Sequence, residues 1–243
     1  MRIPTLFLAV TFTMALTACT DKKETTAIPE NAVSDTLSNS TQTKSPEATI
    51  ESDTVTFVQY NDDGDYFFML VQKNNSSYPL IYDWENSDAY DFHRGDVLQV
   101  TWKNDTITIA GDNESHEVAA KALTARKIKD GAVSKFRKQH PNPLKYIYTE
   151  DLNDSFRDKL YLLTEYYIAN SKEPLVALVA KNPKAVIQYS IEKQQRDSKE
   201  YYAIGISNGT SENKAIFHWL YIDPEEMTLY DYDLPNDKLI FFP

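Results

Sequence analysis

The chain has 243 residues, of which 42% are hydrophobic and 12% aromatic, and it carries 36 Asp and Glu against 25 Lys and Arg. The net charge of −11 argues against nucleic acid as a partner, because phosphate binding needs a basic surface. The single cysteine permits neither an internal disulfide nor a cysteine-based zinc site, and the aromatic content is too high for a wholly disordered chain.

The first residues predict a secretory signal peptide over residues 1–18. Arg2 precedes an apolar run from about Ile3 to Leu16, which is shorter than the roughly 20 residues of a membrane-spanning helix. Leu16-Thr17-Ala18-Cys19 resembles the lipobox of bacterial lipoproteins. The resemblance implies cleavage between Ala18 and Cys19 and lipidation of the Cys19 thiol, which would make the membrane a partner through an acyl anchor. The alternatives are an ordinary cleaved signal and an uncleaved apolar terminus.

Residues 19–50 are expected to form the lipidated cysteine and a disordered tether. Residues 20–50 contain 11 Ser or Thr and no aromatic residue, so they offer too little apolar surface to offset the entropy of ordering. In lipoproteins of this kind an Asp directly after the cysteine favours the inner membrane. The chain has Thr20 there, so the resemblance implies the cell envelope, with the outer membrane favoured over the inner.

A small antiparallel β-barrel, OB-like or lipocalin-like, is predicted over residues 51–130. β-rich runs occupy residues 54–60, 65–72, 78–82, 97–102, 106–110 and 117–128. Turns are expected at 61–64, 103–105 and 111–114, and the aromatic residues Tyr60, Tyr66, Phe67 and Phe68 flank the first of them. A calcium loop is the alternative at 61–64, but Gln59 and Leu70 occupy the positions where carboxylates are needed.

Residues 131–150 are predicted to connect the barrel to a second, α+β domain at 151–243. The connector holds a short helix at 133–139 and a crossing stiffened by Pro141 and Pro143, and its basic residues form either solvated surface or a ridge for an anionic headgroup. Asp151 or Asn153 can cap a helix over 154–173, and Pro174 opens another that ends at Ala180. Five strands are expected at 185–193, 200–207, 214–222, 228–233 and 238–242. Helices followed by a meander predict an α+β fold with a curved antiparallel sheet.

Residues 185–233, which end in the segment HWLYIDPEEMTLYDYD, resemble the hairpin region of PepSY-type and cystatin-like domains, and nuclear-transport-factor-like cones share the layout of helix and sheet. These resemblances imply a binding or inhibitory module without a cofactor. The chain as a whole resembles uncharacterised two-domain envelope lipoproteins, a likeness that implies no chemistry.

The sequence patterns predict no catalytic residue, no metal ligand and no cofactor. His93, His116, His140 and His218 stand apart, without the spacing of a zinc site. Ser115-His116-Glu117 has suitable residue types, but neighbours on a strand point to opposite faces. The phosphate-binding and nucleophile motifs are missing from the sequence, and the adjacent acidic residues are better explained as solvated turns.

Aromatic residues in the last strands allow two interpretations. Strand alternation places Phe217, Trp219 and Tyr221 on one face, with Tyr230 and Tyr232 on the next strand. These rings form either core and cross-strand pairs or an exposed patch that binds a peptide, a glycan or a partner protein. The leading hypothesis is a non-enzymatic, lipid-anchored envelope protein that binds an envelope protein or glycan. A carrier or sensor of a small apolar ligand is the alternative, and a hydrolase using dispersed carboxylates ranks last.

Overall fold

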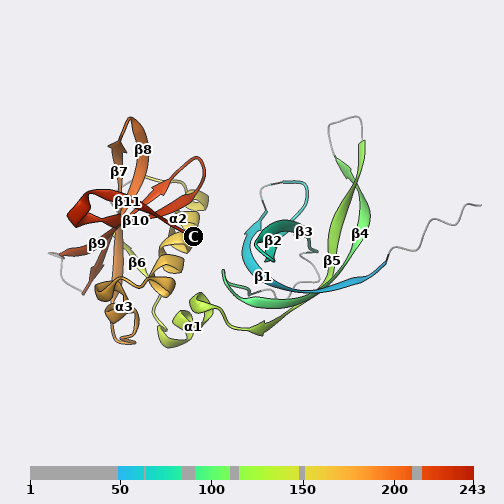
Figure 1. Ribbon diagram of the computed structural model, residues 1–243, viewed down its shortest axis with the longest axis horizontal. Helices are drawn as coiled ribbons and strands as arrows, with labels where there is room; N and C mark the ends of the chain where they lie inside the picture. The colour runs from blue at the N-terminus through green and yellow to red at the C-terminus, as the bar shows by residue number, and fades with distance from the viewer. Residues whose placement is uncertain (1–48, 63, 84–90, 110–114, 148–150, 210–214) are drawn as a thin grey trace, which may run out of the picture. The chain divides into compact units, whose positions relative to one another are not determined.

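The computed structural model describes residues 49–62, 64–83, 91–109, 115–147, 151–209 and 215–243. The chain divides into Met1–Ser45 and Pro46–Pro243, and every described residue belongs to the second unit. This part has an α+β fold, as predicted: a closed five-stranded barrel, then a six-stranded sheet with three α-helices (Figure 1). The predicted signal peptide, Ala18, Cys19 and nearly all of the tether lie outside the described residues. None of the helices in the described ranges is long and apolar enough to span a membrane.

The barrel consists of β1 (Glu51–Asn61), β2 (Phe68–Lys73), β3 (Ser76–Ile81), β4 (Val97–Ile109) and β5 (Ser115–Lys129), in the order β1-β2-β3-β5-β4. Neighbouring strands are antiparallel except β3 and β5, which run parallel with Ile81 opposite Lys121. Alternate apolar residues point inward because side chains alternate along a strand. They fill the interior with Val55, Phe57, Met69, Val71, Leu80, Leu98 and Val100.

The predicted turn at residues 103–105 is wrong, because β4 runs through it without interruption. Lys103, Asn104 and Asp105 pair with residues 121, 120 and 119 of β5 in a regular antiparallel ladder. Lys-Asn-Asp is a turn-forming sequence, but the pairing along β5 overrides this local preference. The other predicted barrel strands are present with shifted ends, and β2 begins at Phe68 rather than at residue 65. The turn predicted at 111–114 lies outside the described residues.

The helices follow their sequence signals closely. α1 (Ala132–Gln139) leaves the barrel, and α2 (Asp154–Asn170) is capped by Asn153, whose Oδ1 accepts a hydrogen bond of 2.8 Å from the Phe156 N–H. Asp151, the other predicted cap, is not the N-cap residue. α3 (Pro174–Ala180) begins at its proline, where the missing N–H costs nothing.

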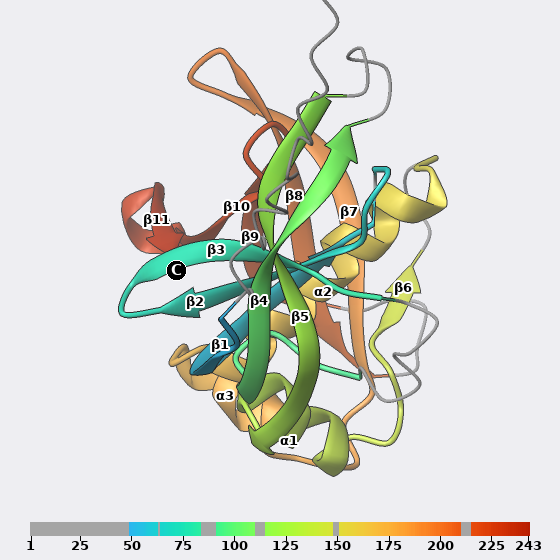
Figure 2. The same cartoon turned by 90° about the vertical axis from the view of Figure 1, so that its right-hand side faces the viewer.

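The second sheet has the order β11-β10-β9-β8-β7-β6. Its strands are β6 (Lys145–Ile147), β7 (Ile187–Arg196), β8 (Lys199–Asn208), β9 (Ile216–Asp223), β10 (Thr228–Asp233) and β11 (Lys238–Phe242), with a 3-10 turn at Leu234–Asn236. The sheet is antiparallel except for β6 and β7, and β6 was not predicted. Leu160, Tyr167 and Ile168 of α2 pack on apolar residues of β7, β8 and β9, so α2 covers one face of the sheet (Figure 2).

Candidate binding groove

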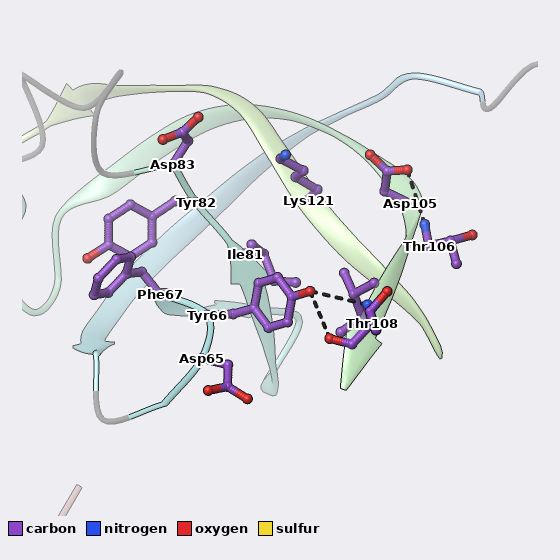
Figure 3. Close-up of a pocket in the computed structure, with 11 residues that line it drawn as sticks. Asp65, Tyr66, Phe67, Ile81, Tyr82, Asp83, Asp105, Thr106, Thr108 and Lys121 are labelled. Atoms are coloured by element: carbon purple, nitrogen blue, oxygen red, sulfur yellow. Dashed lines mark hydrogen bonds between the residues drawn. The ribbon is translucent and has the colours of Figure 1, made fainter. Parts of the chain in front are cut away.

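A cavity of about 590 Å³, here named the barrel groove, opens on the surface of the barrel (Figure 3). Three stretches of chain line it: the loop between β1 and β2, the end of β3 with the residues after it, and the outer part of the β4–β5 hairpin. These contribute Asp65, Tyr66 and Phe67; Ile81, Tyr82 and Asp83; and Asp105, Thr106, Ile107, Thr108 and Lys121. The groove therefore combines aromatic rings with carboxylates.

The aromatic wall of the groove is formed by Phe67 and Tyr82, whose ring centroids lie 6.1 Å apart (Figure 3). Phe67 is 39% exposed and lines the groove. The Tyr82 hydroxyl donates a hydrogen bond of 2.8 Å to Asp62 Oδ1. Burial, together with this bond, raises the pKa of Tyr82 well above its usual value, so its hydroxyl stays protonated at neutral pH.

Tyr66 ties the β1–β2 loop to β4. Its hydroxyl donates to the carbonyl oxygen of Thr108 (3.0 Å) and accepts from the Thr108 N–H (3.2 Å) (Figure 3). Both main-chain groups of Thr108 therefore point away from β5 and toward the groove. The tyrosine hydroxyl takes the place that a neighbouring strand would otherwise occupy.

The groove is bordered by the outer edge of β4 as well as by a face of the β4–β5 hairpin, from which Lys121 of β5 reaches the cavity. Residues 105–108 all line the cavity, whereas side chains on one face of a strand come from every second residue. β1 pairs with β4 only as far as Trp102, so no described strand covers the outer edge of β4 beyond that residue. The continuation of β4 through 103–105 thus creates the wall of the groove.

Carboxylates outnumber cations among the residues that line the groove, which include Asp65, Asp83 and Asp105 but a single cation, Lys121. Asp105 also binds Lys103 Nζ at 3.1 Å, and this hydrogen bond lowers the pKa of Asp105 and keeps the carboxylate ionised. The other oxygen of Asp105 accepts from the Thr106 N–H at 3.1 Å. The groove is therefore suited to a cationic or neutral ligand and repels an anionic one.

The predicted aromatic patch is divided in the structure. Phe217 packs against the core beneath α2, because the register shifts between Ile206 and Ser207 opposite it and interrupts the alternation assumed for β9. Trp219 is half-buried. Tyr221 is only 4% exposed and donates a hydrogen bond of 2.6 Å to Gln194 Oε1.

Tyr221, Tyr230 and Tyr232 belong to a ring cluster on the sheet. The Tyr221 and Tyr232 centroids lie 5.3 Å apart, and the Arg196 guanidinium lies 5.4 Å and 5.0 Å from them. Tyr230 meets Tyr201 edge-on at 6.1 Å. These contacts are internal, which favours the interpretation of the rings as cross-strand packing.

One group of residues has the composition of a catalytic triad but not its geometry. Ser134 Oγ lies 3.5 Å from His93 Nδ1, yet it donates to Asp96 Oδ2 at 2.9 Å. In a working triad the carboxylate orients the histidine, whereas here it binds the serine directly. His93 Nε2 meets Arg137, and Ser134 is buried. Within the described ranges, no group of His, Cys, Asp and Glu side chains is arranged to hold a metal ion.

Asp96 has a structural role at the junction of the barrel and α1. Its side chain is fully buried and accepts from the N–H groups of Gly131 (2.7 Å) and His93 (3.0 Å), from Ser134 and from Lys127 Nζ (3.1 Å). Burial alone would raise the pKa of Asp96, but these donors outweigh burial and leave its pKa below the usual value. The ionised carboxylate therefore fixes the start of α1 against the barrel.

His218 joins two elements of the second sheet domain. Its Nε2 lies 2.8 Å from the Tyr167 hydroxyl and 2.7 Å from Asp231 Oδ1. Because both contacts involve the same nitrogen, the three residues do not form a relay through the ring. His116 contacts Thr108 Oγ1 at 3.2 Å, and His140 contacts the carbonyl oxygen of Ala180 at 2.7 Å.

Comparisons with known proteins give no family. No protein-family model matches the chain, and no curated protein matches it. Similar solved structures include a mitochondrial single-stranded DNA binding protein from S. cerevisiae, with 12% identity, a TM-score of 0.26, and coverage of 35% of this chain and 98% of that one. Aspartyl tRNA synthetase from Entamoeba histolytica has 10% identity, a TM-score of 0.26 and coverage of 68% and 48%. Asparaginyl-tRNA synthetase from Pyrococcus horikoshii has 8% identity and a TM-score of 0.25, with coverage of 68% of this chain and 49% of that one. At these TM-scores the similarities carry no argument about the partners of this chain.

The sequence did not predict the groove as a site. The sequence places the aromatic residues Tyr66 and Phe67 beside a hairpin, but it predicts a turn at Asp105. Their proximity depends on the pairing of β4 with β5 and on the hydrogen bonds from Tyr66 to Thr108, both of which join distant parts of the chain. A run of aromatic and acidic residues beside a predicted turn was the only available signal.

Proposed function

We propose that this chain is a lipid-anchored protein of the bacterial cell envelope that binds another envelope macromolecule in its barrel groove. The observation that carries the proposal is the groove itself, in which aromatic rings and carboxylates converge on an open strand edge. Aromatic residues with a few placed polar groups are typical of recognition sites for peptides and glycans. The lipobox at Leu16–Cys19 supports attachment to the envelope, with the outer membrane favoured.

The barrel is best described as OB-like. An up-and-down barrel such as a lipocalin pairs consecutive strands, whereas here β3 pairs with β5 and β5 with β4. OB barrels bind their ligands on the face of strands 2 and 3 and on the loops between strands 1 and 2 and between strands 4 and 5. The groove shares the loop between β1 and β2 with that surface, which supports both the barrel type and the site. The second half, with α2 over a meander, is proposed as a cystatin-like accessory module.

A carrier of a small apolar ligand is less well supported. Met69, Val71, Leu80, Leu98 and Val100 are fully buried and occupy the barrel interior where such a ligand would bind. Hydrolysis by dispersed carboxylates is also less well supported, because a general acid needs a raised pKa, whereas the hydrogen bond to Lys103 lowers the pKa of Asp105 in the groove. Binding at the outer groove is therefore the favoured function.

The anchor is tested by replacing Cys19 with Ser in the producing cell. The parent protein is expected to partition into the detergent phase and the variant to appear in the soluble fraction, since the acyl chains supply the attachment. Equal detergent partitioning of the two proteins would refute lipidation at Cys19.

The groove is tested by placing a photo-crosslinking amino acid at Asp65 and, as a matched control, at Asp158. Both residues are exposed acids, but Asp65 lines the groove and Asp158 lies on α2. We expect a crosslinked envelope component from position 65 and none from position 158. Identical adducts, or no adduct at 65, would contradict binding in the groove.

A further inference from the structure

The charge and edge geometry of the barrel groove define its ligand more narrowly. We infer that the groove binds an extended, Lys- or Arg-bearing segment of a partner protein, which adds as a short strand to the outer edge of β4 at Thr106. This inference rests on the proposed function, since it names the partner class of the same groove.

The main-chain groups of Thr106 and Thr108 point to the outer edge of β4. The N–H and carbonyl of Thr108 both reach the Tyr66 hydroxyl and so point away from β5. Groups on alternate residues of a strand point to the same edge. Because the β4–β5 register is regular from Trp102 onward, the N–H and carbonyl of Thr106 point into the groove as well.

Side chains cover that edge of β4 at both Thr106 and Thr108. The Thr106 N–H is held by the Asp105 carboxylate at 3.1 Å, and the Thr108 groups are held by Tyr66. Side chains that satisfy an exposed edge protect it from indiscriminate pairing. The Asp105 contact joins neighbouring residues and is easily exchanged, whereas Tyr66 bonds Thr108 twice and comes from a distant loop. An added strand therefore pairs at Thr106 and ends before Thr108.

The carboxylates of the groove favour a cationic side chain on the added strand. A partner carbonyl that replaces Asp105 at the Thr106 N–H releases one carboxylate oxygen, and Asp65 and Asp83 line the same cavity. A cationic side chain of the added strand can pair with Asp65 and lie against Phe67, which is 39% exposed. In recognition by strand addition, hydrogen bonds to the main chain of the edge strand supply affinity, and pockets for the side chains supply specificity.

The experiment compares Thr106→Pro with Thr106→Val in the full chain. Proline removes the N–H that faces the groove and leaves the groups that face β5, so the ladder persists, while valine keeps the N–H. The probe is a short blocked peptide that alternates Lys and Thr, and its matched control alternates Glu and Thr. We expect the Lys peptide to bind the parent and the valine variant, the proline variant to bind about tenfold more weakly, and the Glu peptide not to bind.

A second pair of variants keeps the inference testable if proline disturbs the fold, which far-UV circular dichroism reports. Asp65→Lys is expected to weaken the binding of the Lys peptide, and Asp158→Lys is expected to leave that binding unchanged. Equal binding of the Lys and Glu peptides, or an unaffected and folded proline variant, would overturn the inference. Binding of a neutral oligosaccharide in place of the Lys peptide would also overturn it, while crosslinking from position 65 would still support the groove as a site.

Discussion

Gly131 occupies a position where the chain approaches itself too closely for any side chain. A Cβ atom at this residue would lie 2.4 Å from the carbonyl carbon of Gly95, 2.6 Å from its oxygen and 2.7 Å from the nitrogen of Asp96. All three are main-chain atoms, which cannot rotate away. The backbone angles of Gly131, φ −73° and ψ −174°, suit any residue, so the penalty of Gly131→Ala is steric and not conformational.

The expected loss follows from two contributions. Overpacking of this kind destabilises by about 1–3 kcal/mol. Any displacement of Gly131 also weakens its 2.7 Å hydrogen bond to the buried Asp96 carboxylate, a charge-assisted bond of about 1.5–3 kcal/mol. We therefore expect Gly131→Ala to reduce the free energy of unfolding by about 4 kcal/mol, or the Tm by roughly 8–16 °C for a domain of this size.

The assay is urea unfolding followed by tryptophan fluorescence, with Gly64→Ala as the matched control. A Cβ at Gly64 meets no atom within 4 Å, and that substitution is expected to change stability by less than about 0.5 kcal/mol. If Gly131→Ala also stays within about 0.5 kcal/mol of the parent, the close contact between residues 95 and 131 does not exist as described.

Three further predictions concern other named contacts. Burial and the nearby Arg137 lower the pKa of His93, so the unfolded chain binds a proton more readily, and the free energy of unfolding should fall as the pH drops below about 6.5. His93→Gln should flatten that pH dependence in urea unfolding, and an unchanged slope would contradict the assignment. The Glu165 side chain, only 3% exposed, accepts two 2.7 Å hydrogen bonds from Arg137. Glu165→Leu should lower the free energy of unfolding by about 3 kcal/mol, a loss limited because the Arg137 side chain is 38% exposed and can partly resolvate. Adding Arg137→Met should recover most of this loss, because it removes the unpaired charge. Asn153→Ala should lower the free energy of unfolding by about 1 kcal/mol, because it removes the cap of α2, whereas Asn153→Asp keeps a capping oxygen and should lower it little. Equal losses of stability for the two variants in thermal unfolding would exclude capping.

The elements that sequence analysis predicted well carry local signals. Asn153 and Pro174 mark helix starts through the backbone groups that they satisfy or lack, and both helices begin there. The β-rich run at residues 54–60 predicted a strand, and β1 spans that run, with Val55 and Phe57 buried in the barrel. A cap or an alternating pattern acts within a few residues, so the sequence contains it directly.

The elements that sequence analysis missed depend on distant pairing. β6 has only three residues and forms because Lys145–Ile147 pairs in parallel with β7, more than forty positions along the chain. Phe217 turns toward α2 because of a register shift opposite Ser207, which no feature of its own strand announces. Features of this kind can be predicted only when the partner strand and its register are already known.

The turn wrongly predicted at residues 103–105 coincides with the groove, and the coincidence has a physical basis. β1 ends its pairing with β4 at Trp102, so β4 continues with β5 alone and leaves one edge without a strand. Polar residues such as Lys103 and Asp105 are appropriate on such an edge because they discourage aggregation, and the same residues have low strand propensity. Local preference and observed structure therefore conflict where an open edge needs polar side chains. Conflicts of this kind concentrate at functional sites, which is an independent reason to place ligand binding at Thr106.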